Sequence, residues 1–214
     1  MSLTRVSRGG MIPHVTHQGT GWIEVITGCM FSGKTEEMIR RVRRAQYARQ
    51  AVVVFKPELD KRYSDDNVDS HSGLTIRSIR VSHADQIPGN VGDAGVIAID
   101  EAQFFDEALV GVCEDLANHG RRVIVAGLDM DYLGRPFEPI PQLLAVAEYI
   151  QKMLAICVVC GNPADRSQRI VKRDARVLVG ETDAYEARCR LHWNPHNFEP
   201  IQQRLALGRN LADG

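Results

Sequence analysis

Long apolar runs are absent from this sequence. No stretch approaches the roughly 20 apolar residues that span a membrane, and residues 1–20 lack the apolar segment of a secretory signal. Charge of one sign is not in excess either, because 26 Lys and Arg against 27 Asp and Glu leave a formal net charge of -1. Such a chain has no general attraction to nucleic acid or to anionic membranes. We therefore expect a cytoplasmic protein that binds neither nucleic acid nor membrane.

The even set of cysteines that a disulfide framework needs is also missing. Five cysteines in a chain without an export signal favour metal-binding or core roles instead. The 214 residues are enough for one main core with a small appended module. We expect a flexible N-terminal tail at residues 1–20, an α/β domain at 21–148, a small cysteine-containing module at 149–196, and a C-terminal tail or helix at 197–214.

Short apolar, β-branched runs alternate with helical patterns through the first two thirds of the chain. Such alternation predicts a parallel sheet flanked by helices, with the carboxyl ends of the strands, and hence Thr27, Asp100 and Gly127, at one ligand-binding edge. Residues 56–73 are polar and lack apolar periodicity, so we expect a mobile loop there. The predicted strands are 22–27, 51–55, 96–99 and 123–126, and the predicted helices are 33–49 and 106–118.

A glycine-rich motif separates the first predicted strand from the first predicted helix. It matches the phosphate-binding pattern Gly-x-x-x-x-Gly-Lys-[Ser/Thr], in which backbone N–H groups and the helix N-terminus surround phosphate oxygens. Lys34 would hold the β and γ phosphates of a nucleoside triphosphate, and Thr35 would bind Mg²⁺. We call this the phosphate loop; its residues are Gly28, Cys29, Met30, Phe31, Ser32, Gly33, Lys34 and Thr35. Cys29 is better explained as a small loop residue than as a reactive thiol.

Two carboxylates follow the apolar run at 96–99. The expected fold places them beside the phosphate loop, where Asp100 would hold Mg²⁺ and Glu101 would act as a general base. The alternative is that Glu101 and Gln103 only cap the next helix. The residues do not show which group gives its proton to Glu101. If the donor is water, the protein is an ATPase; if it is a substrate hydroxyl, the protein is a kinase.

Cysteine and histidine residues form two pairs in the last third of the chain. Cys157 and Cys160, with Cys189 and His192, have the spacing of two knuckles that close a tetrahedral zinc site, although a redox pair is the alternative. Four protein ligands leave no position for water, so this zinc would be structural. His196 is the rival fourth ligand. Cys113 lies on an apolar helix face and is assigned to the core.

Together these motifs resemble the thymidine kinases of the human cytosolic and bacterial type, over about residues 21–195. The resemblance implies a P-loop NTPase-like fold and γ-phosphoryl transfer from ATP to the 5′-hydroxyl of thymidine for nucleotide salvage and DNA synthesis, with Glu101 as the base. It also implies feedback inhibition by thymidine triphosphate and a homotetramer. The segments that carry it are residues 28–35, Asp60-Lys61-Arg62-Tyr63, Asp100 to Phe105, Gly127-Leu128-Asp129 with Pro136-Phe137, and the four metal ligands.

The same resemblance implies roles for individual residues. Besides the phosphate loop, the residues near ATP would be Asp60, Arg62, Asp100 and Gln103. A lasso-like loop between the knuckles would close over thymidine, with main-chain groups of Arg176, Val177, Leu178, Val179 and Gly180 at the base. The remaining nucleoside contacts would come from Met30, Leu128, Tyr132, Phe137, Ser167 and Tyr185. Tyr132 and Ser167 stand where the family commonly has phenylalanine and threonine, so other nucleosides could be accepted.

Two other functions fit parts of the pattern. An ATP-driven nucleic-acid motor would use Glu101 to activate water and the basic run Arg40-Arg41-Val42-Arg43-Arg44 to contact phosphates, although such a run on a helix usually forms a solvated face. A non-catalytic nucleotide sensor would bind ATP without needing Glu101.

Overall fold

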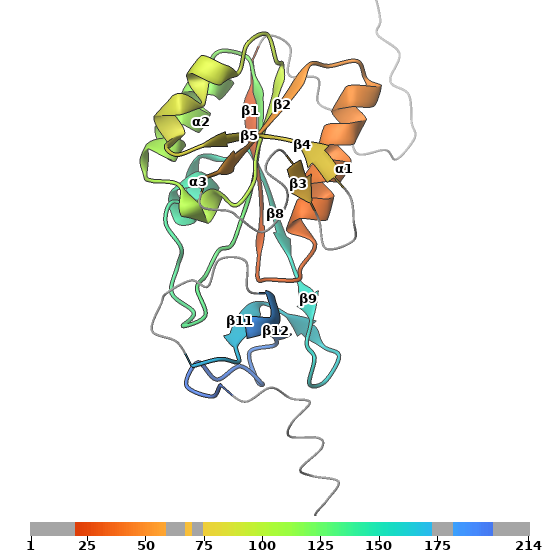
Figure 1. The fold of residues 1–214 in the computed structure, drawn as a ribbon, viewed down its shortest axis with the longest axis vertical. Helices are drawn as coiled ribbons and strands as arrows, with labels where there is room; N and C mark the ends of the chain where they lie inside the picture. Colours follow the sequence, from red (N-terminus) through yellow and green to blue (C-terminus); the bar gives the residue numbers. More distant parts are fainter. Residues whose placement is uncertain (1–19, 59–66, 70–74, 173–181, 199–214) are drawn as a thin grey trace, which may run out of the picture.

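A six-stranded parallel sheet forms the centre of the protein. The computed structural model describes residues 20–58, 67–69, 75–172 and 182–198 (Figure 1). The strand order is β5-β2-β6-β7-β1-β8, and every pairing in this sheet is parallel, which confirms the predicted sheet. The strands are β1 (Trp22–Gly28), β2 (Val52–Pro57), β5 (Ile79–Val81), β6 (Val96–Ile99), β7 (Arg122–Gly127) and β8 (Tyr149–Met153).

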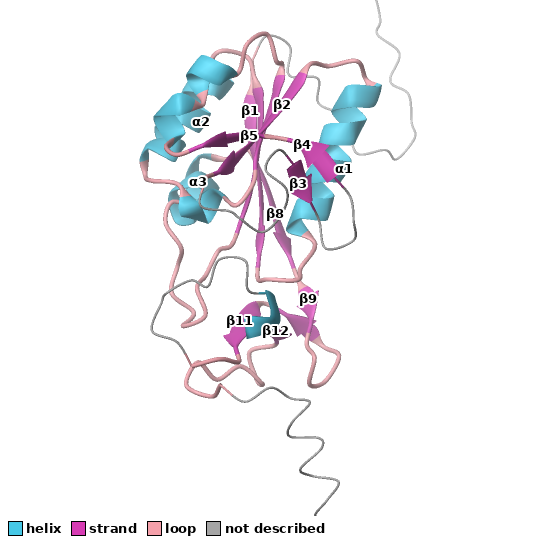
Figure 2. Cartoon of the chain, in the orientation of Figure 1, coloured by secondary structure: helices cyan, strands magenta, loops and turns pink. Residues whose placement is uncertain are grey.

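Helices cover both faces of this sheet (Figure 2). α1 (Lys34–Tyr47) buries Met38, Ile39 and Val42 against one face, on side chains of β1, β2, β6 and β7. α2 (Ala108–Asn118) and α3 (Ile140–Val146) pack on the other face, where Cys113 is fully buried in the core. The central strands β6 and β7 are buried on both faces because helices exclude water from both, as is usual for parallel sheets, whereas the edge strand β8 is largely exposed.

Short elements connect the main layers. β3 (Asn67–Asp69) pairs with β4 (Thr75–Arg77) in an antiparallel hairpin, so the predicted loop at 56–73 is wrong at its start, where β2 continues to Pro57, and at β3. Pairing with β4 satisfies backbone N–H and C=O groups and does not require the apolar periodicity on which the prediction rested; residues 59–66 and 70–74 of the predicted loop lie outside the described residues. The 3-10 helices are η1 (Ala84–Gln86), η2 (Pro88–Asn90), η3 (Ala102–Phe104) and η4 (Thr182–Ala184).

A small module lies beyond the carboxyl ends of the strands (Figure 1). It contains the antiparallel pairs β9 (Ala155–Ile156) with β10 (Pro163–Ala164) and β11 (Arg166–Arg169) with β12 (Tyr185–Arg188). The expected boundary at residue 149 falls just before β8, yet β8 pairs with β1 and so extends the main sheet to Met153. Within the described part of the chain, no helix is long and apolar enough to cross a membrane.

Candidate active site

The phosphate loop connects β1 to α1, as the motif predicts. Gly28 has φ 145°, and a Cβ atom there would lie 2.3 Å from the Met153 carbonyl oxygen, so a side chain cannot be accommodated. Gly33 adopts the left-handed conformation at the N-cap of α1. Ser32 donates a hydrogen bond from Oγ to the Cys29 carbonyl oxygen at 2.8 Å. The loop is therefore closed on itself before α1 begins, and the N-terminus of α1 faces the site.

Lys34 lies at the centre of the charged groups. Its Nζ donates to the Cys29 carbonyl oxygen at 2.7 Å. Burial lowers the pKa of the Lys34 ammonium, whereas the nearby carboxylates of Glu101 and Asp100 act in the opposite direction. The two predicted carboxylates and the phosphate-loop lysine thus occupy the same small volume.

Asp100 and Thr35, the two predicted Mg²⁺ ligands, are in direct contact. Thr35 Oγ1 donates to Asp100 Oδ2 at 3.2 Å, and Asp100 is buried immediately after β6. The backbone N–H of Glu101 donates to Asp100 Oδ1 at 2.9 Å and so fixes the carboxylate plane. A hydroxyl and a carboxylate side by side at a phosphate-binding loop match the oxygen ligands that Mg²⁺ prefers.

Glu101 does not cap the helix that follows it. No side-chain capping hydrogen bond is made at η3, so the capping alternative is not supported. Its backbone has φ 52° and ψ 41°, the left-handed region, which costs a non-glycine residue roughly 1 to 3 kcal/mol and occurs often at functional sites. Its Oε2 accepts a hydrogen bond from Gln103 Nε2, and Gln103 Oε1 in turn accepts from the Leu128 backbone N–H at 2.9 Å.

The small module holds one side of the phosphate loop. The backbone N–H of Met30 donates to Ser167 Oγ at 3.0 Å, and Cys29 Sγ donates to the Ala164 carbonyl oxygen at 3.3 Å. Cys29 is buried in the core of the module, and burial raises the pKa of its thiol. Cys29 is therefore a packing residue, in agreement with the sequence interpretation.

Arg169 joins two aromatic residues that the resemblance assigns to the nucleoside. Its guanidinium carbon lies 3.7 Å from the centre of the Tyr132 ring, and its Nη2 donates to the Tyr185 hydroxyl at 2.7 Å. Arg169 is fully buried on β11, whereas Tyr132 belongs to the loop after β7. The sequence analysis missed Arg169, since no motif in a single sequence marks an isolated arginine as buried.

The loop after β7 carries the remaining nucleoside candidates. Phe137 is buried and donates its backbone N–H to the Asp129 carbonyl oxygen at 3.0 Å, while Trp193 Nε1 donates to the Tyr132 carbonyl oxygen at 3.2 Å. Asp129 forms an ion pair with Lys152 at 2.7 Å. This loop is thus held between the sheet and the module. Asp60, Arg62 and residues 176–180 lie outside the described residues.

The four predicted metal ligands form one group. One ligand atom from each of Cys157, Cys160, Cys189 and His192 lies within 4.8 Å of the others, and His196 is not a member. The Sγ atoms of Cys160 and Cys189 are 3.8 Å apart, and His192 Nδ1 is 3.3 Å from Cys189 Sγ. A tetrahedral ion with bonds of about 2.3 Å places its sulfurs roughly 3.8 Å apart, so this group could hold zinc.

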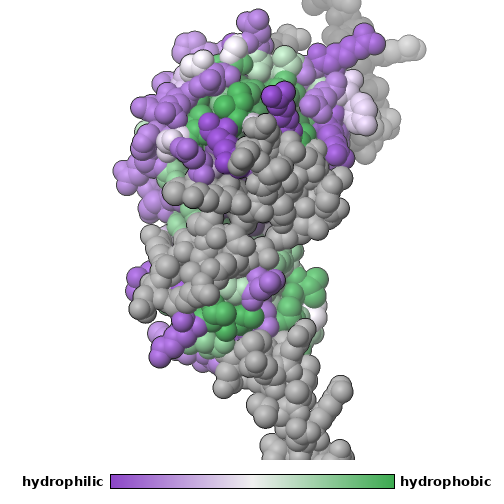
Figure 3. All heavy atoms as spheres, in the orientation of Figure 1, coloured by the Kyte–Doolittle hydropathy of each residue, from purple (hydrophilic) through white to green (hydrophobic). Residues whose placement is uncertain are grey.

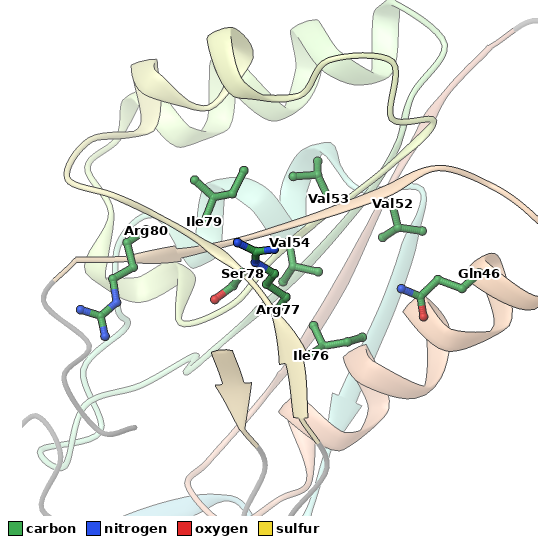
Figure 4. A pocket seen from close by; sticks show the side chains of 9 residues that line it. All are labelled: Gln46, Val52, Val53, Val54, Ile76, Arg77, Ser78, Ile79 and Arg80. Atoms are coloured by element: carbon green, nitrogen blue, oxygen red, sulfur yellow. The ribbon is translucent and has the colours of Figure 1, made fainter. Parts of the chain in front are cut away.

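A cavity of about 600 Å³ lies elsewhere, between the end of α1 and strands β2, β4 and β5 (Figure 4). Its lining includes Gln46, Val52, Ile76, Arg77 and Arg80 and none of the predicted site residues. The site is therefore defined by the converging loops at the carboxyl edge and not by this cavity.

Known proteins match most of this chain. Residues 21–193 match the family model described as thymidine kinase. A protein named thymidine kinase from Rhodothermus sp. (strain ITI 518) is 59% identical over 180 residues, which cover 84% of each chain. Another thymidine kinase, from Bdellovibrio bacteriovorus, is 54% identical over 181 residues, 84% of this chain and 89% of the relative. With a phosphate loop, an acidic pair and a Cys3His group in one structure, the chain belongs to the thymidine kinase family.

Proposed function

We propose that this protein transfers the γ-phosphoryl group of ATP to the 5′-hydroxyl of thymidine and so supplies thymidine monophosphate for DNA synthesis. One observation carries the proposal: Lys34 and the Thr35–Asp100 pair meet Glu101 where α1 begins and β6 ends. The names of the two relatives support thymidine as the nucleoside.

The phosphates of ATP would lie on the backbone N–H groups of residues 28–35, with Lys34 exchanging its bond to the Cys29 carbonyl for phosphate oxygens. Mg²⁺, held by Thr35 and Asp100, would neutralise charge on those oxygens. Glu101 accepts the 5′-hydroxyl proton as that oxygen bonds to the γ phosphorus, while the bond from the γ phosphorus to ADP breaks. Ordering the reactants in one enclosed site is the main catalytic contribution expected of the protein.

The nucleoside would bind between the loop after β7 and the small module. Met30, Leu128, Tyr132, Phe137, Ser167 and Tyr185 would line it, with residues 176–180 at the base. Asp60 and Arg62 would contact ATP. The Ser167 hydroxyl, which accepts from Met30, keeps its own hydrogen for the nucleoside.

The Cys3His group would hold a structural zinc ion, and this ion would anchor both ends of the lasso-like loop that the resemblance implies. The module, which begins after Met153, would then support that loop.

A homotetramer and inhibition by thymidine triphosphate complete the proposal. Apolar side chains lie at the surface of the small module (Figure 3), where Leu154, Ile156 and Val158 are 51%, 66% and 49% exposed. An apolar surface of this kind is typical of a contact between subunits.

The nucleic-acid motor is less well supported. Arg40 and Arg41 of the basic run form ion pairs with Glu37, and Arg41 also pairs with Glu24 at 2.6 Å. Arginines engaged in this way are less available for a nucleic-acid backbone, and the proposed kinase needs no such contact.

The test is a panel of nucleosides with ATP and Mg²⁺, scored for 5′-monophosphate. Selective conversion of thymidine would support the proposal. ATP hydrolysis without any phosphorylated nucleoside, or hydrolysis stimulated by DNA or RNA, would contradict it.

Arg169→Met should weaken thymidine binding. Loss of the guanidinium leaves the Tyr185 hydroxyl without this donor and removes the contact with the Tyr132 ring. We expect the KM for thymidine to rise roughly 10- to 100-fold, the equivalent of a lost charged hydrogen bond, while the KM for ATP changes little. Arg166→Met is the matched control, because Arg166 is buried on the same strand but stacks on Trp193. An unchanged KM for thymidine in folded Arg169→Met protein would show that Arg169 does not organise the nucleoside side.

A further inference from the structure

Gln103 is buried between two parts of the proposed site. Its side chain is in the 3-10 turn after β6, and the residue is 4% exposed. The amide nitrogen donates to the Glu101 carboxylate, and the amide oxygen accepts from the Leu128 backbone N–H at 2.9 Å. A flipped amide would place its oxygen against a carboxylate and its N–H₂ against an N–H donor, so one orientation is strongly favoured.

The end of β7 leaves room for this amide. A Cβ atom on Gly127 would lie 3.0 Å from Gln103 Oε1, 3.3 Å from Ala102 Cβ and 2.8 Å from Ile140 Cδ1. A larger residue at position 127 would push on the amide that reaches Leu128. Gly127 and Gln103 therefore fit each other, and the contact is part of the packed core at the base of the site.

We propose that Gln103 is a positioning residue: it orients the carboxylate of Glu101 and joins it to the main chain of Leu128 on the nucleoside side. This inference rests on the proposed function, in which Glu101 is the base. The resemblance assigns Gln103 to the phosphates of ATP, but its amide oxygen and nitrogen already bond to protein groups. The bond to Glu101 restricts the carboxylate rotamer, and the bond to Leu128 prevents the glutamine itself from moving.

An effect on catalysis follows from this geometry. A carboxylate held in one orientation approaches the hydroxyl proton with less rotational entropy to lose. The effect acts through Glu101, which means that it should change kcat but not ATP affinity.

The test uses Gln103→Leu, which keeps the approximate size and removes the hydrogen bonds. We expect kcat to fall roughly 10- to 100-fold while ATP affinity stays within about threefold. Gln103→Glu retains an acceptor for the Leu128 N–H but loses the amide donor to Glu101, so it should lower kcat and leave the KM for thymidine and the affinity for ATP within about threefold. Gln46→Leu, on α1 and away from the site, is the control.

The outcomes separate this inference from the proposed function. A parent enzyme that phosphorylates no nucleoside would refute the function itself. A parent that phosphorylates thymidine, together with folded Gln103 variants that keep its kcat, would overturn only the positioning role. A large loss of ATP affinity with an unchanged kcat would assign Gln103 to the phosphates and also overturn the inference. If Gln103→Leu does not fold, the kcat and ATP affinity of Gln103→Glu decide.

Discussion

Glu101→Gln should lower kcat by roughly 10² to 10⁴ while ATP binds about as tightly as to the parent protein. The amide has nearly the same shape as the carboxylate but cannot accept the hydroxyl proton. ATP would be held by the phosphate loop and by the Thr35–Asp100 pair, and neither of these contacts passes through the Glu101 side chain. Steady-state phosphorylation of thymidine and direct titration with ATP would measure the two quantities separately.

Glu107→Gln is the matched control for this prediction. Glu107 is exposed at the start of α2, six residues beyond Glu101, and lies outside the proposed site. Loss of ATP affinity in Glu101→Gln would mean that Glu101 serves the nucleotide and not the proton transfer. Full activity in the same variant would show that Glu101 is not the general base, whereas a parent that binds ATP and phosphorylates nothing would favour a nucleotide sensor.

The sheet and the phosphate loop could be predicted because their signals are local. Residues 22–27, 96–99 and 123–126 are short apolar runs buried on both faces, and the glycine spacing of the loop reflects close backbone contacts such as that of Gly28 with Met153. Parallel connections then place the carboxyl ends at one edge, and so Asp100 lies beside Thr35.

The polar interactions around the site could not be predicted in the same way. On β11, Arg166, Ser167, Gln168 and Arg169 are all buried, although their hydropathy is that of a surface strand. What they contact depends on the docking of distant segments, including Trp193 and Tyr132. The pairing of β8 with β1 was missed for a related reason: composition changes near residue 149, whereas strand pairing depends on the register between segments 125 residues apart in sequence, Glu24 and Tyr149.

Removing a ligand of the Cys3His group should also have a large effect, on zinc content and on stability. Cys157→Ser should lower the zinc content from about one ion per chain and reduce stability, because the variant loses part of the ~10 to 16 kcal/mol that zinc binding contributes in small zinc domains. The group ties the turn after β9 to the turn after β12, and β12 pairs with β11, which carries Ser167 and Arg169. Metal analysis and thermal unfolding would measure the change.

Loss of zinc should affect the two substrates unequally. The module contacts the phosphate loop through Ser167. It reaches Tyr132 through the buried Arg169, which also donates to Tyr185 within the module, so a loosened module should raise the KM for thymidine more than the KM for ATP. His196→Ala is the control that tests the ligand set: His196 is exposed and outside the Cys3His group, and its removal should leave zinc in place, whereas His192→Ala should not. If His192→Ala retains zinc and His196→Ala loses it, the fourth ligand is His196 and not His192. If the native protein is active without any metal, zinc is not what holds the module in place.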